Sequence, residues 1–144
     1  MSSRLRISVY WIVLVVTVFN AVSAIGGGIA VVATDGAGMP HSFLARGPFT
    51  SFTVPGLILT FVVGGTQTLA AVLLILRKES SLLWTAVAGA GMVIWIFVET
   101  GIIAGISWLQ VLYFATGGLQ IVAVNALLGI ADWLPRRPLR GSGT

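Results

Sequence analysis

At 144 residues the chain is long enough for a single domain, and that domain is too apolar to have a water-soluble surface. It is 57% hydrophobic and only 8% charged, and its mean hydropathy is +1.03, whereas soluble domains carry about 25% charged residues. The net charge of +4 does not indicate a nucleic-acid partner, because the cations lie just beyond the ends of apolar runs, where membrane proteins carry them. The absence of cysteine excludes disulfides, thiolate metal sites and thiol catalysis.

Four apolar stretches, taken in chain order, are each long enough to cross a bilayer as a helix. A helix needs about 20 apolar residues to span about 30 Å of hydrocarbon, and a helix satisfies its own backbone groups within lipid. The predicted spans cover about 7–32, 55–76, 82–104 and 108–130. We therefore predict an all-α protein with one membrane domain, an up-down-up-down four-helix bundle, with an outer loop over 33–54 and a tail over 131–144.

The first span has an alternative interpretation as a secretory signal. Two arginines precede it, and Val22-Ser23-Ala24 resembles a cleavage site. The apolar run continues past that site to Val32, which favours an uncleaved span. Cleavage of residues 1–24 would leave three spans and an N-terminus outside the cell.

The outer loop contains the turn signals Asp35-Gly36 and Met39-Pro40. The simpler interpretation is a semi-ordered connection between the first two spans. The functional alternative is a flap over the outer mouth of the bundle.

The basic residues predict that both ends of the chain lie in the cytoplasm, because Lys and Arg are enriched in cytoplasmic flanks. Of the eight Lys and Arg residues, Arg46 alone lies in the outer loop. The others are Arg4, Arg6, Arg77, Lys78, Arg136, Arg137 and Arg140. The expected location is the bacterial plasma membrane, with membrane lipids as partners. A homo-oligomer or a larger membrane complex is compatible with the sequence, and no nucleic-acid partner is expected.

Spans two and four share the pattern F-x-x-G-G-x-Q-x-x-A, over residues 61–70 and 114–123. Both spans run in the same direction, so the pattern predicts two helical hairpins related by an axis along the membrane normal. Paired glycines let helices approach closely, and Gln67 and Gln120 are expected to form hydrogen bonds between helices. Asn20 in the first span is expected to do the same. Packing is the simpler interpretation of these features, and a ligand site is the alternative.

Glu99 is the ionisable residue that lies well inside a predicted span. It is about 9 Å beyond the midpoint of the third span, and so about 6 Å beneath the outer interface. A carboxylate at this depth is costly, so it must be protonated, paired or in contact with water. Trp95 is one helical turn below it, Gln110 and Tyr113 lie at a similar depth in the fourth span, and Arg46 is the outer cation that could reach it.

Three roles are open for Glu99. It could fix the helix register, it could anchor a small polar or amphipathic ligand together with Trp95, Gln110, Tyr113 and Arg46, or it could serve proton- or cation-coupled transport in a small oligomer. Catalysis is the least favoured, because one acid and one loop histidine make a poor acid–base set and no catalytic motif is present. We expect no cofactor and no metal site. The prediction is a non-enzymatic accessory or ligand- or lipid-binding protein with an outer-leaflet site at Glu99.

Part of the chain resembles a family of small membrane proteins. The likeness rests on W-I-F-V-E over 95–99, S-W-L-Q over 107–110, Y-F at 113–114, and the segments P-F-T-S-F and P-G-L over 48–52 and 55–57. This arrangement is similar to uncharacterised four-span proteins common in actinobacteria. The resemblance covers about residues 48–128 and implies a class of protein without an activity.

Two other families share only part of these features. In size and topology the chain resembles DoxX-like four-helix membrane proteins. Small multidrug-resistance transporters also have four spans and one membrane glutamate. Their glutamate lies in the first span, where this chain has Asn20 and no acid, so the transporter analogy is weak.

Overall fold

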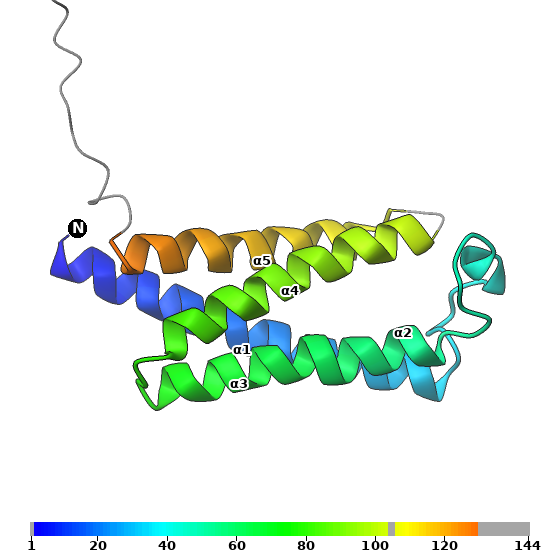
Figure 1. Ribbon diagram of the computed structural model, residues 1–144, viewed down its shortest axis with the longest axis horizontal. Coiled ribbons are helices and arrows are strands. Elements are labelled where there is room, and N and C mark those ends of the chain that lie inside the picture. The colour runs from blue at the N-terminus through cyan, green and yellow to red at the C-terminus, as the bar shows by residue number, and fades with distance from the viewer. Residues whose placement is uncertain (1, 104–105, 130–144) are drawn as a thin grey trace, which may run out of the picture.

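The computed structural model describes residues 2–103 and 106–129, and this part of the chain is helical, without strands (Figure 1). Four helical rods are long and apolar enough to cross a membrane, which confirms the prediction of an all-α four-helix bundle. The second rod, Thr53–Ile75, is divided into an α-helix, a π-helix and a second α-helix. The elements are α1 (Ser3–Ala33), the 3-10 turn η1 (His41–Leu44), α2 (Thr53–Leu57), the π-helix η2 (Ile58–Val63), α3 (Gly64–Ile75), α4 (Ser81–Ile102) and α5 (Trp108–Leu127).

The ends of the helices follow from local signals. The Ser2 hydroxyl accepts a hydrogen bond from the Leu5 backbone N–H at 3.3 Å, so α1 begins before the apolar run does. At the end of α5, Gly129 has a φ of +72°, the left-handed conformation that commonly terminates a helix. Residues 104 and 130, the predicted last residues of spans three and four, lie outside the described part of the chain, as does the predicted tail over 131–144.

The four rods pack as a square. The main contacts join α1 to α3 and α5, and α4 to the same two helices, so α3 and α5 lie on one diagonal of the bundle. The loop over residues 34–52 covers one end, which we call the loop end, and the N-terminus lies near the turn between α3 and α4 at the other (Figure 1). We call that other end the basic end, because Arg4, Arg6, Arg77 and Lys78 lie there.

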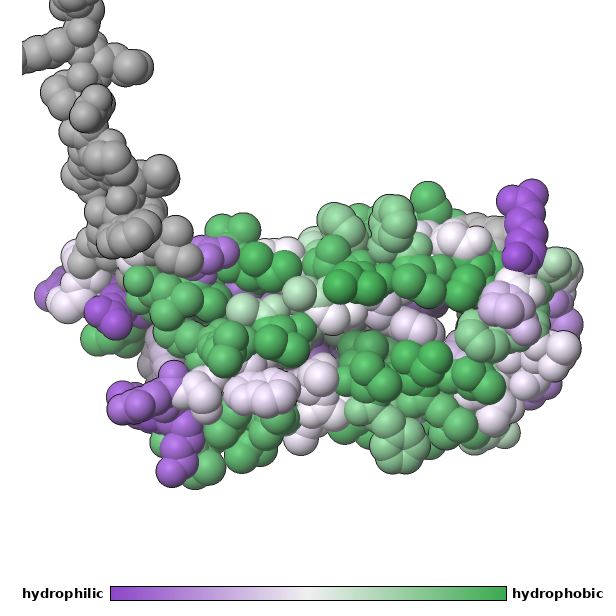
Figure 2. All heavy atoms as spheres, in the orientation of Figure 1, coloured by the Kyte–Doolittle hydropathy of each residue, from purple (hydrophilic) through white to green (hydrophobic). Residues whose placement is uncertain are grey.

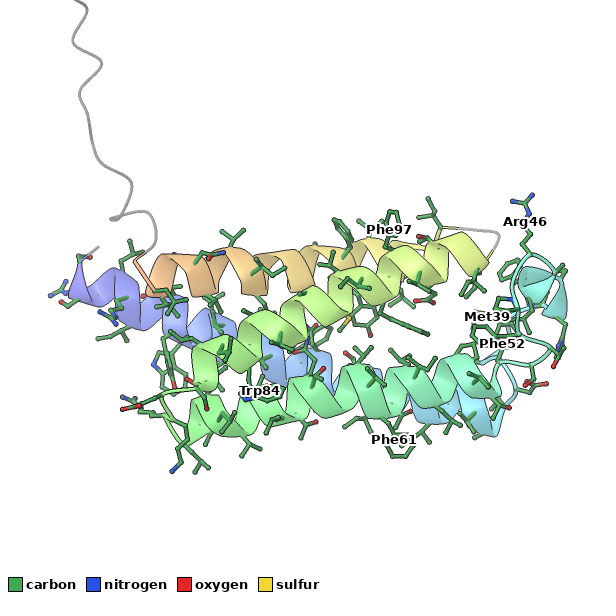
Figure 3. The ribbon with its side chains drawn as sticks, in the orientation of Figure 1. Met39, Arg46, Phe52, Phe61, Trp84 and Phe97 are labelled. Carbon is green, nitrogen blue, oxygen red and sulfur yellow. The ribbon has the colours of Figure 1, made fainter. Side chains whose placement is uncertain are left out.

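Large apolar side chains cover the outside of the bundle. Figure 2 shows them around the middle of the molecule, with hydrophilic side chains gathered at its two ends. Phe61 and Phe97 point away from the helices (Figure 3) and are 71% and 76% exposed. A surface of this kind is compatible with burial in a bilayer and would be unfavourable in water.

The interior is divided into two apolar clusters. One, towards the basic end, is built from Val13, Leu74, Ala123 and Leu127. The other, towards the loop end, is built from Ala24, Val63, Met92 and Ile96. Fully buried polar side chains from α1, α3, α4 and α5 complete the core.

Candidate functional site

A layer of hydrogen-bonded amides occupies the centre of the bundle. Gln67 of α3, Gln120 of α5 and Asn20 of α1 are all fully buried. Gln67 Nε2 donates to Gln120 Oε1 at 3.0 Å, and Gln120 Nε2 donates to Gln67 Oε1 at 2.8 Å. Asn20 Nδ2 also donates to Gln120 Oε1, at 3.1 Å. The three interhelical polar residues singled out in the sequence therefore form one network.

Two further groups complete this layer. Gln120 Nε2 donates to Thr17 Oγ1 at 2.8 Å, and Gln67 Nε2 donates to the Ala88 carbonyl oxygen at 3.1 Å. All four helical rods thus contribute to the network. Asn20 Oδ1 is the exception, because it is buried and has no hydrogen-bond partner among the described residues.

A cavity of about 470 Å³ lies on the loop side of this layer. Its walls come from α1, from the loop, from Leu59 of η2, from α4 and from the start of α5. Four of the five predicted ligand-binding residues line it, namely Glu99 and Trp95 of α4 and Gln110 and Tyr113 of α5. Its volume falls within the range of about 300–1,000 Å³ that is typical of small-molecule sites.

Glu99 lies in the last turn of α4 and is half-buried. Gln110 is the polar side chain adjacent to its carboxyl group. The side-chain amide of Gln110 is oriented through its oxygen, because Oε1 accepts a hydrogen bond from the backbone N–H of Ser107 at 2.8 Å. This bond uses the amide oxygen as a cap for α5, and it leaves the Gln110 N–H groups as the donors that can serve Glu99.

Trp95 contributes an unsatisfied donor. Its indole Nε1–H is buried and has no partner among the described residues. Trp95 is one turn from Glu99 on the same helix face, and both residues line the cavity. Buried polar groups are normally paired, so this N–H is a candidate contact for a ligand.

Tyr113 lies at the inner end of the cavity, between α1 and α5. Its ring stacks on Phe19 of α1, with centroids 6.4 Å apart and an interplanar angle of 25°. Below this pair, α1 and α5 are joined through the amide layer; beyond it, both helices line the cavity. The lining includes Ala30 of α1 and Leu109 of α5, which are also exposed on the outside of the bundle.

The loop forms the roof of the cavity. Met39 and Phe43 line it, and Figure 3 shows Met39 and Phe52 on the side of the loop that faces the helices. Phe52 is 1% exposed and anchors the loop, while its backbone N–H donates to Asp35 Oδ1 at 3.3 Å. The loop is thus packed onto the bundle.

Arg46 is not part of the cavity. It is exposed and points away from the helices (Figure 3), and the cavity lining does not include it. Glu99 forms no ion pair with any cation in residues 2–103 and 106–129. The loop turns the Arg46 side chain outward, so Arg46 does not make the contact with Glu99 that its charge would have allowed.

Several features of the site were not anticipated from the sequence. The loop residues Met39 and Phe43 carry no helical periodicity that could have placed them over the cavity. The π-helix Ile58–Val63, which directs Leu59 to the cavity, has no recognisable sequence signal. Within the described residues, no group of three or more His, Cys, Asp or Glu side chains could hold a metal ion.

Comparison with known protein families, with curated proteins and with solved structures finds no match to this chain. The resemblance to four-span actinobacterial proteins accordingly stays a prediction.

Proposed function

We propose that this chain is a non-enzymatic, multi-pass protein of the bacterial plasma membrane that binds a small amphipathic molecule, such as a lipid, at the loop end. The observation that supports the proposal most directly is the composition of the cavity of about 470 Å³. It combines Glu99, which carries the carboxyl group, with Trp95, whose buried indole N–H has no hydrogen-bond partner among the described residues, in an otherwise mostly apolar lining.

The wall chemistry defines the class of ligand. A polar end that carries both a hydrogen-bond donor and an acceptor would be matched by Glu99 and by the Trp95 N–H respectively. The remaining surface, which includes Met39, Phe43 and Leu109, would receive an apolar body. If both termini are cytoplasmic, as the basic residues predict, the cavity belongs to the outer leaflet.

The exposed residues of the lining support access from the bilayer. Ala30, Ile106 and Leu109 are exposed residues that line the cavity, and they belong to the apolar outer face of the bundle. A molecule dissolved in the membrane could slide between the ends of α1 and α5 without crossing the roof loop. This supports a lipid-soluble ligand rather than a water-soluble metabolite.

The alternative function is a small oligomeric transporter or channel, coupled to protons or cations at Glu99. Gln67, Gln120, Thr17 and Asn20 are fully buried beneath the cavity, and a conducting path would require this hydrogen-bonded layer to separate. The layer therefore supports a closed binding site over a path through the bundle.

The test is native mass spectrometry of the full-length protein in mild detergent, with identification of co-purified small molecules. We expect a lipid-like molecule on the wild type and its loss from Trp95→Phe, which keeps an aromatic ring and removes the N–H, and from Glu99→Gln. Trp84→Phe is the matched control, since Trp84 lies on the same helix outside the cavity. Equal retention by all four proteins, or no bound molecule on the wild type, would refute the proposal.

A further inference from the structure

A second cavity, of about 390 Å³, lies at the basic end of the bundle. Its walls come from the first turns of α1, from the turn between α3 and α4, and from the end of α5. Three cations line it: Arg6 of α1, and Arg77 and Lys78 of the turn, against one acid, Glu79. Basic residues from two distant parts of the sequence thus converge on one hollow, and the described residues that line it carry a net positive charge.

Arg77 occupies a backbone position at the end of α3 that usually favours glycine. Its N–H donates to the Leu74 carbonyl oxygen at 3.0 Å, and the Lys78 N–H donates to that of Leu73 at 3.0 Å. This is the Schellman arrangement, in which glycine is the usual residue at the left-handed position. Arg77 occupies that position with a φ of +51°. This conformation is less favourable for an L-residue than for glycine.

The side chain of Arg77 is held against the cavity wall. Its guanidinium lies 5.6 Å from the centroid of the Tyr10 ring, in a cation–π arrangement. The Tyr10 hydroxyl in turn donates to the Leu74 carbonyl oxygen, which ties α1 to the end of α3. Tyr10, Arg77 and the end of α3 therefore form one positioned unit beside Arg6 and Lys78.

The rest of the cavity is apolar. Ile7, Trp11, Leu82 and Leu127 contribute to its lining, and Ile7 and Trp11 are 59% and 54% exposed on the outside of the bundle. Cations placed next to apolar, membrane-facing walls match a molecule with an anionic phosphate joined to hydrocarbon. A free phosphate ion would use the cations and leave the apolar walls unused.

We propose that the basic-end cavity binds the phosphate of an anionic glycerophospholipid between Arg6, Arg77 and Lys78, with the lipid's glycerol and first methylenes against Ile7 and Trp11. Basic pockets between membrane helices are known to take anionic headgroups. This site is separate from the loop-end cavity, and the proposal does not depend on the function proposed there.

The test compares phosphatidylglycerol with phosphatidylcholine on the full-length protein, by native mass spectrometry from mixed-lipid nanodiscs. We expect the wild type to retain phosphatidylglycerol preferentially and Arg77→Gly to lower that preference about fivefold. Glycine suits the left-handed backbone, so thermal stability should hold or rise, which separates a lost site from a lost fold. Arg46→Gly makes the same charge change at the loop end and should leave the preference unchanged.

A second variant and a competition arm complete the design. Arg6→Gln, on another element, should lower the preference by a similar factor. Equal effects of Arg77→Gly and Arg46→Gly would overturn the proposal in favour of general charge attraction, as would equal retention of the two lipids. Displacement of phosphatidylglycerol by excess inorganic phosphate would assign the cations to a soluble anion and overturn the lipid assignment.

Discussion

Gln67 and Gln120 exchange two amide hydrogen bonds, of 3.0 and 2.8 Å, across the diagonal of the bundle. The two residues hold the same place in the repeated pattern over 61–70 and 114–123. Each belongs to a different helical hairpin, α1 with the second rod and α4 with α5. Equivalent residues of the predicted repeat thus bond reciprocally to each other.

Replacement of Gln120 by Met should destabilise the bundle more than replacement of Gln67. Gln120 forms hydrogen bonds with Asn20, Thr17 and Gln67. Its replacement would leave these buried polar groups without that partner. Interhelical hydrogen bonds in membranes contribute up to about 1–2 kcal/mol, so we expect Gln120→Met to lower the free energy of unfolding by about 2 kcal/mol. Denaturation in mixed micelles would measure this.

The control for this substitution is Asn125→Met. Asn125 is exposed, and among the described residues its Nδ2 donates only to the Ile121 carbonyl of its own helix, at 2.9 Å, so the change should be close to neutral. The Gln67→Met and Gln120→Met effects should also be less than additive in the double variant, because the two side chains share bonds. Strict additivity would contradict the reciprocal pair.

The glycine pairs of the repeat should divide into one sensitive and one tolerant position. A Cβ on Gly117 would lie 3.0 Å from the Gly89 carbonyl oxygen, whereas a Cβ on Gly118 would meet nothing within 4 Å. Gly117→Ala should therefore force α4 and α5 apart and cost about 1–3 kcal/mol, while Gly118→Ala should be neutral or stabilising, since Ala favours helix. The same contrast is expected between Gly64→Ala and Gly65→Ala. Paired thermal melts in detergent would test it, and equal effects within a pair would contradict the observed helix contacts.

These glycines show which parts of the fold could be predicted from the sequence and which could not. Hydropathy predicted four spans because length and apolarity are local properties that a bilayer requires. Helical periodicity placed Asn20, Gln67 and Gln120 on facing seams, since residues three or four apart share a face. The pattern could not say which glycine of a pair touches a neighbour, because this depends on how each helix is rotated within the bundle.

The arrangement of the loop and the presence of the π-helix could not be predicted from the sequence, for a different reason. Residues 34–52 have no periodicity, and their arrangement depends on the burial of Phe52 and on Gly36, whose φ is +120°. Arg46 was expected near Glu99 from charge alone, but the direction of a loop side chain is set by the backbone of the loop. The π-helix Ile58–Val63 lies where Gly28 of α1 packs closely against Gly56 and Thr60, a contact that only the assembled bundle defines.

Phe52 should hold the roof loop far more strongly than the contact between Asp35 and His41. His41 Nε2 lies 3.2 Å from Asp35 Oδ2, but both side chains are exposed, and exposed pairs contribute at most about 1 kcal/mol. Truncation of a buried Phe costs about 3–5 kcal/mol. We therefore expect Phe52→Ala to raise amide hydrogen exchange over residues 34–52 on the order of a hundredfold, and His41→Ala to change it little. A larger effect of His41→Ala would show that the loop is held by charge.

Purified protein in liposomes should not conduct protons or small cations. The buried amide layer closes the bundle beneath the cavity, so wild type and Glu99→Gln should give the same basal flux in a pH-sensitive dye assay. Glu99→Gln should nevertheless reduce ligand retention in the same preparation. A flux that is present in the wild type and abolished by Glu99→Gln would establish the transporter instead.

Filling the loop-end cavity from α1 should block ligand binding while the fold remains intact. Gly27 lines the cavity, and a Cβ placed there would meet only Leu59 Cδ2, at 3.9 Å, which is an ordinary contact. Gly27→Leu can therefore extend into the open volume without displacing a helix, and it should eliminate the bound molecule with little change in melting temperature. Gly26 is the matched control, because it is exposed and a Cβ there meets nothing within 4 Å, so Gly26→Leu should keep the ligand. Loss of the ligand from both variants would indicate that it rests on the outer surface of α1, whereas its loss from Gly27→Leu alone would place it inside, against Trp95 and Glu99.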